Sequence, residues 1–198
     1  MGRMERSPAR PLPVVLVHAR AGTAWVWTPL RAALGDAGFS HVVGIDDGCV
    51  DAGLDEIAAE VARLSVLAMA VSDAHAVHLV GHGLGGVAVD RLAARGRLAG
   101  LTATAVTVAS PHRQTFARVP STRWVSYFTD RDRLVPPSTA RLSSRGPDVA
   151  NHFIPGCGHL SLCRDARLVR SVVRELIRSE NPAATGALVG PTAYAQAA

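Results

Sequence analysis

The sequence contains no lysine, so all 21 of its Lys and Arg residues are arginine. With 16 acidic residues, the formal net charge is +5. A basic protein of this kind can be a nucleic-acid binder, but here the arginines are scattered along the sequence. No basic helix and no platform of aromatic and basic residues stands out. We therefore expect no nucleic-acid partner.

Long apolar runs are also absent. None approaches the ~20 residues that a membrane-spanning helix needs, so we expect no membrane span. Arginines precede the apolar run "VVLV" near the N-terminus, as they would in a signal peptide. The run is too short for that purpose, however, and His18 and Arg20 follow at once. It fits a buried first strand better.

Cysteine is scarce. Cys49, Cys157 and Cys163 make an odd number, and they lack the spacing of metal ligands. This usage is typical of reduced thiols in a cytoplasmic protein. We therefore expect a cytoplasmic location, no metal site and no cofactor.

Short valine-rich runs alternate with longer amphipathic segments along the 198 residues. Strands are expected at 13–19, 40–46, 76–82, 101–110, 123–129 and 149–155. Helices are expected at 25–37, 54–71, 84–96 and 163–180. Repeated alternation of this kind predicts an α/β fold in which a parallel sheet is covered by helices on both faces.

The domain boundaries follow from composition. Residues 13–180 are expected to form one domain, because no second hydrophobic pattern and no internal repeat is present. Residues 1–12 form an N-terminal extension. Residues 181–198 are rich in Ala, Gly and Pro and begin with Asn-Pro, which predicts a flexible tail.

Residues that can carry chemistry follow four of the predicted strands. Ligands of open α/β sheets bind at the carboxyl ends of the strands. Those ends are followed by "HARAG" (18–22), a glycine-rich turn at 81–86, "DRDRLVPP" (130–137) and "GCGHLSL" (156–162). The order of turn, acid and histidine is the chain order of the α/β-hydrolase triad.

Five segments together resemble the small, lidless lipases and esterases of the α/β-hydrolase family, over roughly residues 13–180. They are "VLVHARAG", "LVGHGLGG", "TVASPHRQT", "TDRDRLVPPSTARL" and "GCGHLSL". The resemblance implies the minimal α/β-hydrolase fold, with about six parallel strands and no cap domain. It also implies a hydrolase-like site at the carboxyl edge of the sheet.

The resemblance assigns roles to particular residues. Asp132 matches the triad acid because it directly precedes the apolar "LVPP", and Asp130 is the alternative. His159 matches the triad base. The backbone N–H groups of Leu84 and Arg20 match the donors of the oxyanion hole.

Two positions depart from the family pattern. The Gly-x-Ser-x-Gly frame of the nucleophile turn reads Gly-His-Gly-Leu-Gly over residues 81–85, so Gly83 occupies the position of the serine. Without a hydroxyl or thiol at this position, an acyl-enzyme cannot form there. Ala19 stands where the oxyanion loop of the family usually has glycine, and its methyl group restricts the backbone beside Arg20.

Several further residues are candidates for the wall of a substrate pocket: His18, Ala19, Trp25, His82 and His112. Structural roles compete with this interpretation. His18 and His82 also fit buried histidines that bond to the backbone. Trp25 fits core packing equally well. His112 fits a loop histidine with internal partners.

Three classes of function remain open. The first is an enzyme in which the His159–Asp132 dyad acts as a general base without covalent catalysis, in cyclisation, isomerisation, elimination or direct hydrolysis. The second is a conventional esterase or lipase whose nucleophile is mutated or supplied elsewhere. The third is a catalytically inactive binding protein. The expected ligand is a small hydrophobic or carrier-tethered acyl, ester or polyketide-like substrate.

Overall fold

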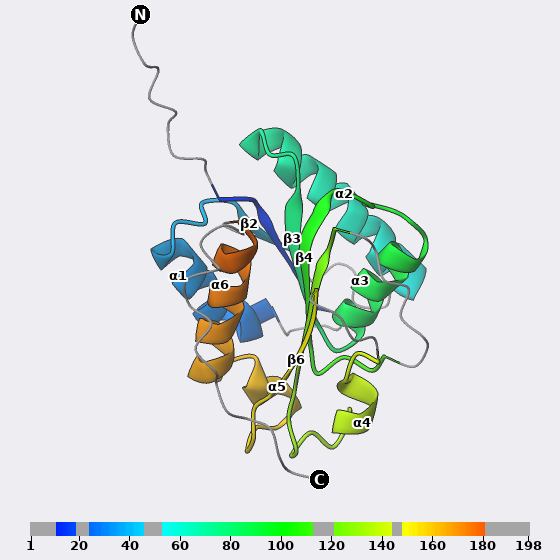
Figure 1. The fold of residues 1–198 in the computed structure, drawn as a ribbon, viewed down its shortest axis with the longest axis vertical. Coiled ribbons are helices and arrows are strands. Elements are labelled where there is room, and N and C mark those ends of the chain that lie inside the picture. The colour runs from blue at the N-terminus through cyan, green and yellow to red at the C-terminus, as the bar shows by residue number, and fades with distance from the viewer. Residues whose placement is uncertain (1–10, 19–23, 46–52, 113–120, 144–147, 181–198) are drawn as a thin grey trace, which may run out of the picture.

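A computed structural model of the protein describes residues 11–18, 24–45, 53–112, 121–143 and 148–180. Six strands form one sheet in the order β2-β1-β3-β4-β5-β6, and every neighbouring pair is parallel (Figure 1). The strands are β1 (Val14–Val17), β2 (Val42–Gly44), β3 (Val77–His82), β4 (Thr102–Val108), β5 (Arg123–Phe128) and β6 (Val149–Phe153). The predicted six-stranded parallel sheet is confirmed. Each strand is one to four residues shorter than predicted, because residues at the strand ends leave the ladder.

Helices cover both faces of the sheet. They are η1 (Ala24–Trp27), α1 (Thr28–Asp36), α2 (Leu54–Ser72), α3 (Leu84–Ala94), α4 (Pro137–Ala140), α5 (His159–Leu162) and α6 (Ala166–Glu180). The helices α1 and α6 lie together on one face, and α2 and α3 lie together on the other (Figure 1). Within the described ranges, no helix is both long and apolar enough to cross a membrane.

Two of the predicted helices differ from the structure at their N-terminal ends. The segment predicted at 25–37 begins with the 3-10 turn η1 before α1, whose first turn contains Pro29. Proline is tolerated there because its missing N–H would have no helical partner. The segment predicted at 163–180 instead begins as α6, and the short helix α5 precedes it. Between the two, the carboxylate of Asp165 accepts the N–H of Arg167 and thereby caps the new helix.

The core consists of two hydrophobic layers that the sheet separates. Alternate side chains of β3 pack into the two layers, with Val80 on the side of α1 and α6 and Leu79 on the side of α2 and α3. The contact between β3 and α3 is very close, because a Cβ on Gly81 would lie 2.6 Å from the Cα of Gly86. Glycine at these positions holds α3 directly against the strand and fixes the turn that joins them.

Candidate functional site

Gly83 forms the turn between β3 and α3, with φ 55° and ψ −122°. Such a conformation costs a residue with a side chain about 1–3 kcal/mol, whereas glycine adopts it freely. The N–H of Gly83 donates to the carbonyl oxygen of Val108 at 2.9 Å, which ties the turn to the end of β4. The chain therefore keeps the sharp strand–turn–helix geometry while presenting no side chain at its tip.

The imidazole of His159 faces this turn. A Cβ built on Gly83 would lie 3.3 Å from Nε2 and 3.6 Å from Cε1 of His159. The histidine is the first residue of α5, and its side chain is 17% exposed. One ring nitrogen of His159 is thus directed at the position from which a nucleophilic side chain would project.

The other ring nitrogen of His159 contacts Asp132. The distance from Nδ1 to Oδ2 of Asp132 is 2.7 Å. The second carboxylate oxygen of Asp132 accepts the backbone N–H groups of Leu134 and Val135, at 2.8 and 2.9 Å. An ionised carboxylate only accepts, so Nδ1 carries the proton of the neutral ring and the lone pair of Nε2 points toward Gly83.

The carboxylate of Asp130 makes different contacts from that of Asp132. Its Oδ1 accepts the N–H of Gly156 at 2.7 Å and the hydroxyl of Thr129 at 3.3 Å. The N–H of Gly156 is the main reason why the pKa of Asp130 lies below its usual value. Asp130 therefore joins the two loops that carry the acid and the histidine, and Asp132 is the residue that contacts the imidazole.

His82 lies beside His159 at the end of β3 and is 5% exposed. Its ring centroid is 4.4 Å from that of His159, and the indole of Trp27 contacts it edge-on. Burial is the main reason why the pKa of His82 is lowered to about 4. His82 is therefore a neutral ring at pH 7. His18 is buried directly after β1.

His112 bonds to the protein through both ring nitrogens. Nδ1 contacts the carboxylate of Asp90 on α3, and Nε2 lies 3.1 Å from the hydroxyl of Thr107 on β4. The side chain of His112 is 3% exposed, and its backbone N–H donates to the carbonyl oxygen of Thr139 in α4 at 2.7 Å. Burial raises the pKa of Asp90, although His112 opposes the shift. These contacts hold α3, β4 and α4 together and leave neither ring nitrogen for a ligand.

Two more of the predicted pocket and oxyanion residues lie at the surface of the site. Trp25 is 47% exposed, and Leu84, the first residue of α3, is 40% exposed. The N–H of Leu84 belongs to the first turn of α3, where backbone donors have no partner within the helix. Ala19 and Arg20 lie outside the described residues.

Sequence reasoning missed two exposed leucines. Leu134 is 74% exposed and Leu160 is 40% exposed. Each is near a member of the dyad in the chain: Leu160 directly follows His159, and Leu134 donates its N–H to Asp132. We group these two leucines with Trp25 and Leu84, which are also large, apolar and exposed, and call the four residues the apolar rim. A signal was present in the sequence, since each leucine directly adjoins polar or charged residues in the segments that carry Asp132 and His159.

Cys157 is not placed as a replacement nucleophile. Its thiol donates to the carboxylate of Asp165 at 3.2 Å. Burial and this carboxylate raise the pKa of Cys157, which suppresses the reactive thiolate. Among the described residues, no three His, Cys, Asp or Glu side chains are grouped in a way that could hold a metal ion.

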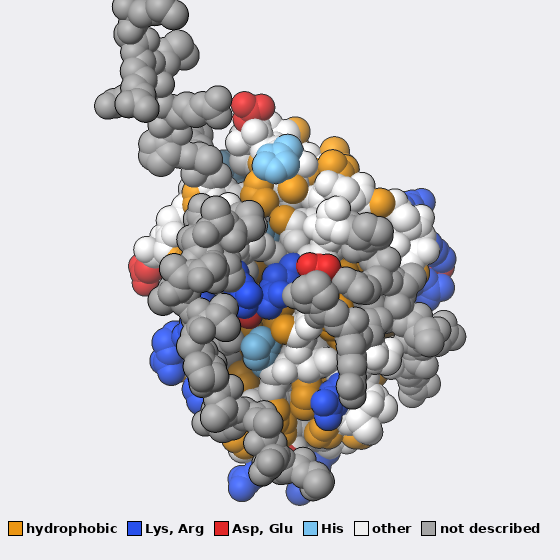
Figure 2. All heavy atoms as spheres, in the orientation of Figure 1, with side chains coloured by type: hydrophobic (Ala, Val, Ile, Leu, Met, Phe, Trp, Pro, Cys, Tyr) orange, Lys and Arg blue, Asp and Glu red, His pale blue; other side chains and the backbone are white. Residues whose placement is uncertain are grey.

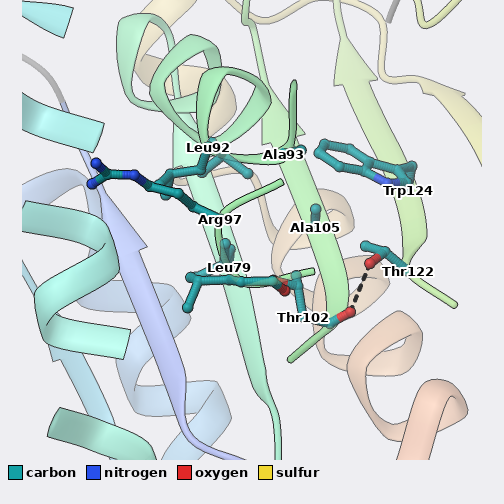
Figure 3. Close-up of a pocket in the computed structure, with 10 residues that line it drawn as sticks. Leu79, Leu92, Ala93, Arg97, Thr102, Ala105, Thr122 and Trp124 are labelled. Atoms are coloured by element: carbon teal, nitrogen blue, oxygen red, sulfur yellow. Dashed lines mark hydrogen bonds between the residues drawn. The ribbon is translucent and has the colours of Figure 1, made fainter. Parts of the chain in front are cut away.

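A small cavity of about 10 Å³ lies between the sheet and α3, far from this turn (Figure 3). Its lining includes Thr102, Thr122 and Trp124, close to where β4 and β5 begin, and Arg97, which follows α3. The volume is enough for about one water molecule. It is a packing defect rather than a substrate pocket.

No protein-family model and no curated protein matches the chain. Solved structures do match. A serine α/β hydrolase without a lid from Xanthomonas campestris is 18% identical, with a TM-score of 0.62 over 86% of this chain and 84% of that one. A hydrolase described as YdeN-like from Pectobacterium atrosepticum is 19% identical, with a TM-score of 0.63 over 86% and 91% of the two chains. The protein therefore has the fold of the lidless α/β hydrolases.

Proposed function

We propose that the protein is a non-covalent general-base enzyme of the α/β-hydrolase fold, in which the His159–Asp132 dyad acts on a hydrophobic acyl or ester substrate. The observation that carries this proposal is the orientation of the dyad. Nδ1 of His159 is 2.7 Å from Asp132, and Nε2 faces the empty tip of the turn at Gly83. A base so directed, with no side chain before it, has room for a water molecule or a substrate hydroxyl.

For direct hydrolysis, Nε2 of His159 removes a proton from a water molecule beside Gly83. The water oxygen forms a bond to the carbonyl carbon, and the π electron pair moves onto the carbonyl oxygen. Backbone N–H groups in the first turn of α3, beginning with Leu84, stabilise that oxyanion. The intermediate then collapses, the leaving group departs with the electron pair of its bond, and the imidazolium returns the proton to it.

The same base supports reactions without water. If a hydroxyl of the substrate occupies the position beside Gly83, its deprotonation lets that oxygen attack the acyl carbon of the same substrate. A lactone forms as the leaving group departs with the electron pair of its bond and takes the proton from the imidazolium. If a carbon acid occupies the position, deprotonation gives an enolate. The imidazolium then returns the proton at another carbon in an isomerisation, or a β-leaving group departs with its electron pair and takes that proton in an elimination. Asp132 has one role throughout, since it orients the ring and stabilises the imidazolium.

The apolar rim supports a hydrophobic substrate. Trp25, Leu84, Leu134 and Leu160 are large apolar side chains that remain between 40% and 74% exposed. They belong to four segments that adjoin or carry the turn, the acid and the base. An acyl chain that covers them gains roughly 25 cal/mol for each Å² of apolar surface removed from water.

The test uses the octanoyl thioester of N-acetylcysteamine as substrate. We expect slow release of octanoate without a burst, no covalent adduct by intact-mass spectrometry, and loss of the rate in His159→Ala. Phosphonate probes directed at serine should not label the protein. An unchanged rate in His159→Ala would exclude the dyad, and an acyl adduct would show that another residue supplies a nucleophile.

A further inference from the structure

The outer face of α6 carries a row of arginines. Arg170, Arg174 and Arg178 recur every four residues, which places them on one side of the helix. All three are exposed, whereas Leu168, Val172 and Leu176 of the same helix are buried in the core. No basic helix stood out in the sequence, although the helix predicted at 163–180 already contains these three arginines.

A fourth exposed arginine, Arg164, precedes the N-terminal end of α6. It lies in the turn between α5 and α6, and its guanidinium carbon is 5.0 Å from the ring centroid of Trp25. This contact joins the row to the apolar rim. We call Arg164, Arg170, Arg174 and Arg178 the arginine ridge. At 1.5 Å per residue, the part of α6 from Ala166 to Arg178 is about 18 Å long.

The charge of the ridge is not neutralised within the described part of the chain. No carboxylate there pairs with any of its four arginines, whereas Arg123 pairs with Glu175 and Arg167 with Asp165. The two acidic residues of α6 point elsewhere, since Glu175 is buried and Glu180 contacts His78.

The part of the sequence that contains the ridge is basic. Residues 121–180 contain ten of the 21 arginines and six of the 16 acidic residues, a net charge of +4. Basic side chains are visible beside α6 and at the end of the molecule where α4 and α5 lie, and also on the opposite side beside α2 and α3 (Figures 1 and 2).

We propose that the arginine ridge binds the acidic helical face of a carrier domain, which presents an acyl thioester to the His159–Asp132 site. The partner identity rests on the function proposed above. The ridge is one helix wide, so it fits acidic residues at helical spacing on the partner. Its site end meets the apolar rim at Trp25, where a tethered acyl chain would arrive.

Two other anionic partners fit less well. A lipid surface would engage apolar side chains along the helix, but most of the apolar residues of α6 face the core, and Ile177, 43% exposed, is the largest exception. Single-stranded nucleic acid is usually held by aromatic side chains on which bases stack. The ridge has no aromatic residue of its own, and Trp25 at its end is a single ring with Arg164 over one face.

The experiment measures binding to an acidic bacterial acyl carrier protein that carries an octanoyl group through a non-hydrolysable amide. The test variant is Arg170→Gln with Arg174→Gln. The matched control is Arg63→Gln with Arg97→Gln, which removes the same charge from other surfaces. We expect the dissociation constant to rise roughly five- to tenfold in the ridge variant and less than twofold in the control at low salt. Binding of the unmodified protein should weaken at ~0.5 M salt.

Equal effects in the two variants, or no binding at all, would overturn the proposal. So would tighter binding to anionic phosphatidylglycerol vesicles or to a single-stranded oligonucleotide than to the carrier. Binding is also measured with His159→Ala. Carrier binding that is retained while the thioester assay shows no dependence on His159 would uphold the ridge as a docking surface and reject the proposed chemistry.

Discussion

Replacing Gly83 by serine adds the one group that the turn lacks. The Cβ of the new residue would lie 3.3 Å from Nε2 of His159. That contact is close, so the imidazole must shift by a few tenths of an ångström. The hydroxyl oxygen then falls within hydrogen-bond distance of Nε2, about 2.6–3.2 Å. We expect Gly83→Ser to gain esterase activity on short p-nitrophenyl esters and to be labelled by fluorophosphonate probes.

The same substitution should cost stability. Gly83 has φ 55°, and this backbone conformation costs a residue with a Cβ roughly 1–3 kcal/mol. For a chain of this size, each kcal/mol lowers the melting temperature by about 2–4 °C. Gly83→Ala is the matched control, because it carries the same backbone strain and the same Cβ contact without the hydroxyl. It should lose about as much stability as Gly83→Ser and gain no activity.

Two results would refute this reasoning. If Gly83→Ser folds but neither hydrolyses esters nor reacts with the probe, the dyad and the turn are not arranged for acyl transfer. If His159→Ala in the serine background leaves the gained activity intact, His159 is not the base. Hydrolysis and probe labelling are compared on the same preparations, with circular dichroism to verify folding.

Three further predictions follow from other contacts. Asp132→Asn should abolish any activity that depends on His159, because an amide can hold the wrong tautomer of the ring, while Asp130→Asn should spare the rate; both are compared in the thioester assay. Because burial lowers the pKa of His82 from 6.5 to about 4, the unfolded chain binds the proton first, so stability is present above pH 6.5 and is lost as the pH falls toward 4. The loss should reach about 3 kcal/mol in urea titrations at pH 7.5 and 4.5, and His82→Asn should reduce it. Gly81→Ala should destabilise the protein by more than ~3 kcal/mol, because its Cβ would lie 2.6 Å from Gly86 in α3. The control Gly35→Ala has open space around its Cβ and should be neutral or stabilising by up to ~1 kcal/mol. Thermal melts compare the two variants.

The sequence predicted the sheet well because its central strands are buried and rich in valine. In β3, for example, all six residues are buried, including His78 and His82. The helix boundaries were less accessible. The break between α5 and α6 depends on the side chain of Asp165, which accepts the N–H of Arg167 and the thiol of Cys157. A contact between two loops of this kind leaves no periodic signal.

The candidate site was predictable where a short motif sets the geometry and less so where tertiary contacts do. The position of Gly83 follows from the strand–turn–helix pattern alone. The choice between Asp130 and Asp132 depends on which carboxylate reaches His159, and the two differ by only two residues in one loop. The partners of His112 come from α3 and β4, so its internal role could not be deduced from its own segment.

The contact between His159 and Asp132 can be interpreted as a catalytic dyad or as a purely structural link. The side chain of Asp132 is 2% exposed and accepts three hydrogen bonds, from His159 and from the backbone of Leu134 and Val135. Removing the imidazole leaves a buried carboxylate with one oxygen unpaired, which costs about 1–3 kcal/mol whether or not the histidine is a base. Loss of stability in His159→Ala is therefore expected under both interpretations and distinguishes nothing. The rate distinguishes them, since a structural link needs only the contact at Nδ1, whereas a base needs the lone pair on Nε2 that faces Gly83.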